Sequence, residues 1–423
     1  MLKSIFKNSF YLLFAECLAK LLIFILTIFF ARALGVDQFG AYSFIFAYAW
    51  VFSIFMDFGT SLAYVKNIAQ DKLLKKEYLE HVVSLKCFLG VCVLIAMVVV
   101  GFILKKNILA IILAGLFVFI DVLNESLKVI FRAYEQLKSE AVSKIVEKVV
   151  FFVLGISTIF LTIFGKITVT KIFLFYTIAA LAGLVVTFYF LKRFGTAKFL
   201  IDIGKWKLFI RESLPYFLMI AFTLIFSRID AILLGIMESE QAVGLYNAAN
   251  QIVLALGIIP VVLVKAVLPR FASLHEQKAV LRKFFGRIFW AALLLGGVIS
   301  LAIFISAPLI IQMLYGEEFA KSVPALQLLI WSFFIISFST ITSFFVIAMN
   351  RQAFVMKAAG VAALINIILN VILIPLYSFI GAAIANIATQ ALLFIMYYVR
   401  ARMLLKGGGK SKLDIEEAAS EVT

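Results

Sequence analysis

The sequence predicts an all-α polytopic membrane protein with about twelve transmembrane helices, and two observations carry this prediction. Of the 423 residues, 64% are hydrophobic and 15% are charged, whereas soluble domains are only about half apolar. The chain also contains about twelve windows of ~20 predominantly apolar residues, each long enough to cross a hydrocarbon core of ~30 Å. These windows are 9–31, 39–62, 82–104, 108–131, 146–164, 168–191, 214–236, 242–267, 288–312, 324–348, 356–376 and 380–400.

The basic residues, which give the chain a formal charge of +16, predict its orientation. The termini and the loops on their side hold roughly 28 Lys and Arg, whereas the loops of the other side hold about six. Because Lys and Arg accumulate in cytoplasmic loops, we expect both termini in the cytoplasm and the protein in the cell (plasma or inner) membrane. The same charges contact anionic headgroups, so the expected partner is the lipid bilayer and not a nucleic acid.

The three cysteines indicate neither a disulfide framework nor a metal site. Cys17, Cys87 and Cys92 lie inside or beside apolar windows, and no pair falls in an outer loop. The first apolar run continues to Ala31 without a small-residue cleavage site, so we expect it to remain as the first helix.

Window 108–131 and its end carry the densest set of charges. Asp121, Glu125, Lys128 and Arg132 follow one another at steps of four, three and four residues, which places them on one helical face. A charged side chain in the middle of a membrane costs about 2.5 kcal/mol or more, so this face must look into the bundle or a water-filled cavity.

Two other windows hold ionisable pairs. Glu16 and Lys20 are one helical turn apart in the first window, where a salt bridge between them is the simplest interpretation. The span Pro215 to Gly235 carries Arg228 and Asp230 in its outer half. Ionisable side chains at such positions indicate a water-filled cavity or an ion pair.

The two halves of the chain contain a short internal repeat. Gly40-Ala41-Tyr42 matches Gly244-Leu245-Tyr246, and the distance from Tyr42 to Lys66 equals that from Tyr246 to Arg270. Two six-helix halves in the same orientation are what a parallel repeat requires, and transporters place their substrate path between such halves. We therefore predict a six-helix lobe at 1–191, an amphipathic cytoplasmic linker at 192–213, a second six-helix lobe at 214–401 and a disordered tail at 402–423.

These motifs resemble those of a known family. The segments ARALGVDQFGAYSF with the later Asp57-Phe58-Gly59, and RIDAILLGIMESEQAVGLYNAA with Leu268 to Phe271, are similar to the polysaccharide transporter or Wzx-type oligosaccharide flippase family of the multidrug/oligosaccharidyl-lipid/polysaccharide (MOP) superfamily. The resemblance implies a V-shaped, MATE-like bundle of two lobes that alternates access. It also implies a substrate, a polyprenyl or dolichyl phosphate or pyrophosphate oligosaccharide, carried from the cytoplasmic to the outer leaflet for glycan biosynthesis.

The deeply placed polar residues give candidate sites for that activity. Cations are donors that suit phosphate oxygens, and carboxylates suit gating or a coupling ion, Na⁺ or H⁺. The substrate-binding candidates are Lys20, Lys128, Arg228 and Asn250, and the coupling or gating candidates are Glu16, Asp121, Glu125 and Asp230. The alternative is that Glu16, Glu125 and Asp230 pair internally with the three cations. No catalytic residue, metal site or other cofactor is expected.

Two rival functions remain open at this point. The same superfamily includes cation-coupled multidrug exporters, whose cavities favour acidic residues, whereas the candidates here are mixed in sign. A polysaccharide polymerase or glycosyltransferase needs an extramembrane catalytic surface, and most outer loops here are only a few residues long. We therefore expect a transporter that is not an enzyme, with glycan-assembly proteins as further partners.

The charge asymmetry makes a testable prediction about topology. Single-cysteine variants near Lys75 and Lys205 should react with a membrane-impermeant maleimide only after the membrane is opened, because both loops are expected in the cytoplasm. A cysteine beside Lys321, in a loop of the other side, is the control and should react in intact cells. Labelling of the Lys75 or Lys205 positions from outside would contradict the orientation.

Overall fold

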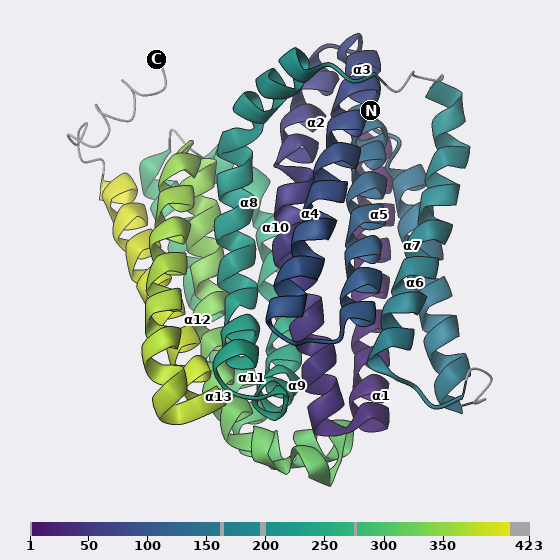
Figure 1. The fold of residues 1–423 in the computed structure, drawn as a ribbon. Coiled ribbons are helices and arrows are strands. Elements are labelled where there is room, and N and C mark those ends of the chain that lie inside the picture. The colour runs from purple at the N-terminus through teal and green to yellow at the C-terminus, as the bar shows by residue number, and fades with distance from the viewer. Residues whose placement is uncertain (1, 161–164, 195–199, 275–276, 407–423) are drawn as a thin grey trace.

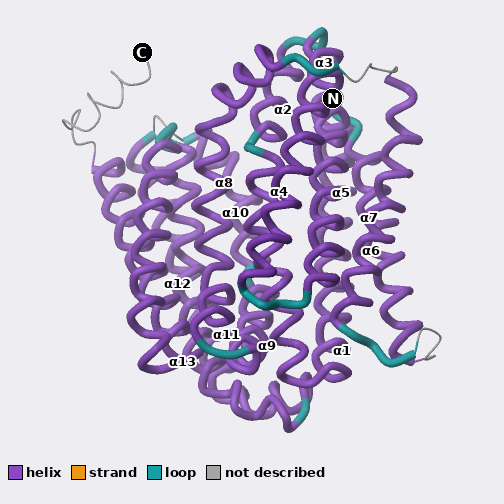
Figure 2. The backbone as a smooth tube through the Cα atoms, viewed as in Figure 1, coloured by secondary structure: helices purple, strands orange, loops and turns teal. Residues whose placement is uncertain are grey.

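The chain forms a bundle of helices. The computed structural model describes residues 2–160, 165–194, 200–274 and 277–406, and every regular element within these ranges is helical (Figures 1 and 2). The elements are α1 (Leu2–Asp57), α2 (Thr60–Gln70), α3 (Leu74–Glu77), η1 (Tyr78–Val82), α4 (Val83–Ile103), α5 (Ile108–Ala133), α6 (Leu137–Phe160), α7 (Val169–Leu191), η2 (Lys192–Phe194), α8 (Ile203–Met237), α9 (Glu240–Leu256), α10 (Ile258–Ser273), α11 (Lys278–Tyr315), η3 (Glu317–Ser322), α12 (Val323–Ala348) and α13 (Gln352–Lys406).

Nine helical stretches in the described residues are long and apolar enough to cross a membrane. Two of them contain two spans each, because α1 and α13 would be about 80 Å long as straight rods and each is interrupted by one residue with non-helical backbone, Gly35 and Ser378. The chain turns back at these residues (Figure 1). A further helix, α6, has 24 residues but carries Lys144, Glu147 and Lys148. The nine stretches thus contain eleven spans, and α6 is the twelfth of the twelve spans expected.

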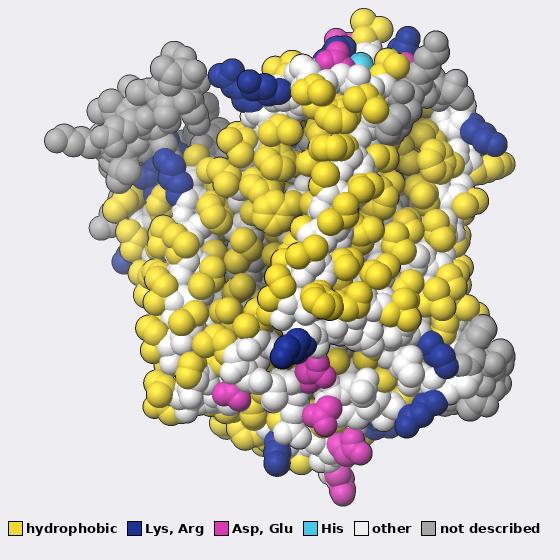
Figure 3. Space-filling model, in the orientation of Figure 1, with side chains coloured by type: hydrophobic (Ala, Val, Ile, Leu, Met, Phe, Trp, Pro, Cys, Tyr) yellow, Lys and Arg dark blue, Asp and Glu magenta, His cyan; other side chains and the backbone are white. Residues whose placement is uncertain are grey.

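The ends of the bundle differ in what they contain. The N-terminus, the yellow end of α13 and α3 lie at one end, which we name the termini end, and α1 and α13 turn at the opposite end (Figure 1). The helix η3 belongs to the opposite end, because a Cβ atom on Gly35, the non-helical residue within α1, would lie 3.2 Å from the side chain of Glu318. Between the ends, hydrophobic side chains cover the flank visible in Figure 3. Large hydrophobic side chains that are exposed include Phe102, which is 74% exposed, and Val185. Such a belt fits a hydrocarbon environment, and the prediction of a multi-pass membrane protein is confirmed.

Side-chain caps fix where several helices begin. In each case an oxygen of the residue before the helix accepts a hydrogen bond from the backbone N–H three residues later, satisfying a donor that the helix itself leaves unpaired. The capping residues are Asn107 of α5, Thr168 of α7, Asp202 of α8 and Ser239 of α9, at 3.1, 3.3, 3.1 and 3.2 Å. Since α8 begins at Ile203, part of the predicted 192–213 linker is helical and continuous with a span, whereas residues 195–199 lie outside the described residues.

The two repeat glycines meet where the halves of the chain cross. A Cβ atom on Gly40 would lie 1.7 Å from the carbonyl oxygen of Glu240, and one on Gly244 would lie 2.2 Å from that of Val36. Glu240 is four residues before Gly244, and Val36 is four residues before Gly40, so the contacts are reciprocal. Reciprocal contacts are those expected of a twofold relation between two similar surfaces. The division into lobes at 1–191 and 214–401 stays a prediction.

Further contacts join the two halves at the opposite end. The Nε of Arg32 donates a hydrogen bond of 2.7 Å to the carbonyl oxygen of Leu314, at the C-terminal end of α11. Lys106, in the loop before α5, forms a salt bridge of 3.3 Å with Glu240. At the termini end the arrangement changes, because α9 packs along α1 whereas α10 packs mainly against α12.

The glycine crossing predicts the effect of adding one methyl group. Gly40→Ala should force α1 and α9 apart, since the new Cβ would overlap the backbone of Glu240, and should lower the free energy of unfolding by about 1–3 kcal/mol. Thermal unfolding of the purified protein measures this effect. Gly286→Ala on α11 is the matched control, because no atom lies within 4 Å of its added Cβ. Equal midpoints for the two variants would show that the crossing is not tight.

Candidate functional site

Arg228 is a half-buried cation on α8, a helix that packs against both α1 and α13. The central carbon of its guanidinium group lies 5.5 Å from the ring centroid of Phe46 on α1, within the range of a cation–π interaction. Its Nε atom is buried and has no hydrogen-bond partner among the described residues. A buried donor without an acceptor is costly, so the site is suited to an incoming anion.

Two tyrosines extend this site. The hydroxyls of Tyr42 on α1 and Tyr176 on α7 are 3.1 Å apart, and the rings of both tyrosines pack against Phe46, the ring that Arg228 contacts. The ring of Tyr176 stacks on that of Phe151 at 3.8 Å, which fixes its position. Arg228, Tyr42 and Tyr176 therefore bring a guanidinium and two hydroxyls together from three helices, and the guanidinium and one of the hydroxyls can donate hydrogen bonds to an oxyanion.

Asp230 lies on the other side of α8 from Arg228. Residues two apart do not face each other on a helix, and the ion pairs of the described region do not join these two side chains. The buried carboxylate of Asp230 accepts hydrogen bonds from the hydroxyl of Tyr246 at 2.6 Å, from Asn370 at 2.8 Å and from Asn386 at 3.0 Å. Its charge is thus stabilised by neutral donors, and Arg228 is left without a carboxylate.

The amides around Asp230 are incompletely satisfied. Asn370 donates to the carbonyl oxygen of Asn366 at 2.9 Å as well as to Asp230. Two buried atoms nearby, Nδ2 of Asn366 and Oδ1 of Asn370, have no hydrogen-bond partner in the described part of the chain. The cluster therefore contains one hydrogen-bond donor and one acceptor that are buried in the second half of the protein without a partner among the described residues.

The charged face of α5 meets charged residues of α6. Lys128 is fully buried and its Nζ lies 3.1 Å from Glu125. Arg132, 27% exposed at its side chain, contacts Glu125 and donates from Nε to both carboxylate oxygens of Glu140 at 3.1 Å. Lys128 is consequently paired where Arg228 is not. Asp121, at the far end of this face, interacts electrostatically with Glu147 and Lys148.

The remaining candidates are less defined. Lys20 is exposed on α1, and the side chain of Glu16 lies outside the described residues, so their pairing stays a prediction. Asn250 is half-buried on α9, and its side chain forms no hydrogen bond within the described residues. The structure thus brings Asp121, Glu125 and Lys128 together on the face that their spacing predicts, and it separates Arg228 from Asp230.

Comparison with known proteins places the chain in a family. A family model described as "Polysaccharide biosynthesis protein" matches residues 5–275. The chain belongs to this family. A second model, "MatE", matches residues 215–372. The family that the resemblance indicates is therefore confirmed.

Two relatives match part of this polysaccharide biosynthesis protein. It is 29% identical over 180 residues to the "Putative O-antigen transporter" of Escherichia coli K12, across 41% of this chain and 43% of that protein. It is 27% identical over 174 residues to the "Probable flippase AglR" of Haloferax volcanii, across 40% of this chain and 36% of that protein. The matched region therefore spans less than half the length of each relative.

Solved structures share the fold over nearly the whole chain. The lipid II flippase MurJ in an inward closed conformation superposes with a TM-score of 0.74 at 15% identity, covering 92% of this chain and 87% of that one. A MATE family transporter of the MOP superfamily in an inward-facing conformation gives 0.73 at 15% identity, covering 92% and 96%. The predicted MATE/MOP-like fold is confirmed.

One buried ion pair of this polysaccharide biosynthesis protein was missed by sequence reasoning. Lys86 on α4 is completely buried, and its Nζ lies 2.6 Å from Asp57, 2.7 Å from the hydroxyl of Ser61 and 2.6 Å from that of Ser126. The signal was present in the sequence, since Lys86 stands inside the apolar window 82–104 as Asp57 stands inside 39–62.

The Lys86–Asp57 pair holds a bend of the backbone. Phe58 and Gly59, which follow Asp57, have positive φ angles of 48° and 72°, and they separate α1 from α2. The bend brings Phe58 onto the ring of Phe217 on α8, with centroids 4.3 Å apart. A Cβ on Gly59 would lie 2.4 Å from the backbone nitrogen of Phe217, so the backbone of this bend and that of α8 are in contact.

Removing one partner of this pair should be costly. Lys86→Met leaves Asp57 as an uncompensated charge and should destabilise the protein by about 3–5 kcal/mol, whereas Lys86→Met with Asp57→Asn should recover much of that loss. Chemical or thermal unfolding measures both. The control is Lys205→Met, which breaks the exposed Lys205–Glu77 pair and should cost under about 1 kcal/mol. Equal losses for Lys86→Met and Lys205→Met would contradict a structural role for the buried pair.

Proposed function

We propose that this membrane transporter is a flippase that moves a lipid-linked oligosaccharide from the cytoplasmic to the outer leaflet by alternating access. The lipid carrier would be a polyprenyl or dolichyl phosphate or pyrophosphate. Its anionic, hydrated head cannot cross hydrocarbon unaided, whereas its tail can remain in lipid while the head passes. The family match and the names of the two relatives support this class of substrate.

The observation that carries the proposal is the guanidinium of Arg228. It is a cation inside the bundle with a buried Nε that lacks an acceptor, and no described carboxylate neutralises it. A phosphate oxygen is the acceptor that a guanidinium binds best. The hydroxyls of Tyr42 and Tyr176 share one hydrogen bond, and the hydroxyl that accepts it can donate its own proton to the same oxyanion.

Lys128 would serve a different stage of transit. Arg228 lies nine residues from the end of α8 at the opposite end, whereas Lys128 lies five residues from the end of α5 at the termini end. The phosphate would meet Lys128 first if Glu125 released it, and Arg228 later. Lys20 and Asn250 remain further substrate-binding candidates in this scheme.

The contacts between the halves support an alternating path. The halves touch at the opposite end through Gly40, Gly244 and Arg32. Toward the termini end α8 still packs on α1 and α2, whereas α10 packs mainly on α12. We infer that substrate enters from the termini end and that release requires the glycine crossing to part. Glycan-assembly proteins on either side are proposed as partners.

Asp230 is the carboxylate best suited to coupling. It sits between Tyr246, Asn370 and Asn386, with spare polar atoms on Asn366 and Asn370. Rotation of the Asn370 amide would present an oxygen beside the carboxylate and create room for Na⁺, and protonation would serve H⁺ equally. Glu16, Asp121 and Glu125 stay gating candidates. A multidrug exporter is less well supported, because the unneutralised group facing the aromatic residues is a cation.

The role of Arg228 can be measured by transport. Arg228→Gln should reduce translocation of a fluorescent lipid-linked oligosaccharide in proteoliposomes about tenfold or more, because charge-assisted hydrogen bonds are worth about 1.5–3 kcal/mol. Arg228→Lys should retain part of the activity. Arg211→Gln, which removes an exposed arginine from the same helix, is the matched control and should leave transport unchanged.

A double variant separates binding from structure. Arg228→Gln with Asp230→Asn should stay as inactive as Arg228→Gln, since the two side chains do not pair. Protein abundance should remain near normal in each. If the double variant restores transport and the single one only lowers abundance, Arg228 has a structural role and does not bind substrate.

A further inference from the structure

A second cationic cavity lies away from Arg228, at the termini end of the bundle. Its volume is about 310 Å³, and it opens between the last turn of α10 and the first turns of α11. Three cations line it, Arg270, Lys283 and Arg287, together with apolar side chains that include Leu274 and Phe284. A cavity of this size is at the lower limit of those that hold small molecules.

The three cations line one cavity, and the described residues of its lining supply no counter-charge. Lys283 and Arg287 are one helical turn apart on α11 and so share a face, and Arg270 belongs to α10. Within the described residues these three side chains take part in neither a salt bridge nor a hydrogen bond, and Glu276 lies outside those residues. Three like charges repel one another, and an anion between them would relieve that repulsion.

The cavity lies at the depth of lipid headgroups. The predicted span 242–267 ends three residues before Arg270, and the span 288–312 begins one residue after Arg287. Its three cations therefore stand next to the ends of these spans, at the membrane surface. The phosphate of a membrane lipid lies at the same depth.

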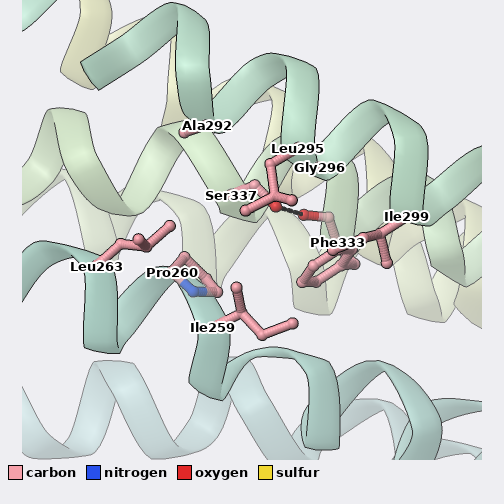
Figure 4. A pocket seen from close by; sticks show the side chains of 9 residues that line it. All are labelled: Ile259, Pro260, Leu263, Ala292, Leu295, Gly296, Ile299, Phe333 and Ser337. Carbon is pink, nitrogen blue, oxygen red and sulfur yellow. Dashed lines mark hydrogen bonds between the residues drawn. The ribbon is translucent and has the colours of Figure 1, made fainter. Parts of the chain in front are cut away.

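Deeper between the same helices lies a much smaller pocket. Ile259 and Leu263 of α10 face Leu295 and Ile299 of α11 around its volume of about 10 Å³ (Figure 4). The hydroxyl of Ser337 on α12, which lines this pocket, donates to the carbonyl oxygen of Phe333 on its own helix at 2.8 Å. The larger cavity and its three cations thus lie at the surface, and an acyl or prenyl chain would extend into the surrounding lipid.

We propose that this cavity binds the phosphate of a membrane lipid at the termini end of the protein. Arg270, Lys283 and Arg287 hold the phosphate oxygens, and the lipid chain extends from them into the bilayer. The lipid is either an anionic phospholipid of the bilayer or a polyprenyl-linked phosphate. This site is separate from the one at Arg228.

The test compares two double variants of α11 that remove the same charge. Lys283→Gln with Arg287→Gln empties the cavity of two cations, whereas Lys278→Gln with Arg282→Gln removes two exposed cations that do not line it. The purified full chain in a neutral detergent is titrated with dihexanoyl-phosphatidylglycerol, with farnesyl diphosphate, with dihexanoyl-phosphatidylcholine and with inorganic phosphate. Microscale thermophoresis gives the dissociation constants.

The lining pair should raise the dissociation constant about tenfold to thirtyfold, because each basic residue near a lipid headgroup contributes about 1 kcal/mol. The control pair should change it less than about twofold. Arg270→Gln, on the other helix, should raise it about fivefold by itself and provides a second test if the lining pair fails to fold. Arg228→Gln should leave the dissociation constant of phosphatidylglycerol unchanged, which keeps this site distinct from the proposed transport site.

The ligand arms identify the source of the phosphate. Binding of phosphatidylglycerol alone assigns the cavity to bulk anionic lipid, binding of farnesyl diphosphate alone assigns it to a polyprenyl-linked phosphate, and binding of both assigns it to either. Equal binding of phosphatidylcholine or of inorganic phosphate overturns the proposal. So does the absence of binding by both anionic lipids, or the same loss in the two double variants.

Discussion

The hydrocarbon of a membrane does not solvate a charge, and the interior of this protein is arranged around that constraint. Lys86 meets Asp57 and two hydroxyls, Arg132 lies between two glutamates, and Asp230 accepts hydrogen bonds from a tyrosine and two asparagines. Against this background the unsatisfied Nε of Arg228 is an exception. Exceptions of this kind concentrate at functional positions.

Helix α8 joins the two sets of contacts. Arg228 points from it toward the aromatic residues of α1 and α7, while Asp230, two residues later, points toward the amides of α13. A rotation of α8 about its axis would shift both side chains at once, because they are fixed to the same rigid rod. An anion held on one face and a cation or proton held on the other would therefore be mechanically linked without any direct contact.

Much of the architecture could be predicted from the sequence, because hydrophobic length and helical spacing are local properties. The twelve windows, the turn at Gly35 and the common face of Asp121, Glu125 and Lys128 follow from residues close together in the chain. Even the separation of Arg228 from Asp230 is implied by their spacing of two.

The partners of the candidate residues could not be predicted in the same way. Asp230 bonds to Asn370 and Asn386, which are 140 and 156 residues away, and Tyr42 bonds to Tyr176. Such pairs depend on which helices are neighbours, and a single sequence does not specify that. Lys86 shows the same limit, since its position marks it as costly but does not reveal that Asp57 neutralises it.

The charges between α5 and α6 have a consequence for the response to voltage. Asp121, Glu125, Glu140 and Glu147 carry as many negative charges as Lys128, Arg132, Lys144 and Lys148 carry positive ones. A displacement of one elementary charge across the membrane potential is worth about 2.3 kcal/mol per 100 mV, and a group with no net charge feels none of this when it moves as a unit. This network can therefore shift along the membrane normal as a unit without electrical work, and the electric field acts on Arg228 together with whatever anion it carries.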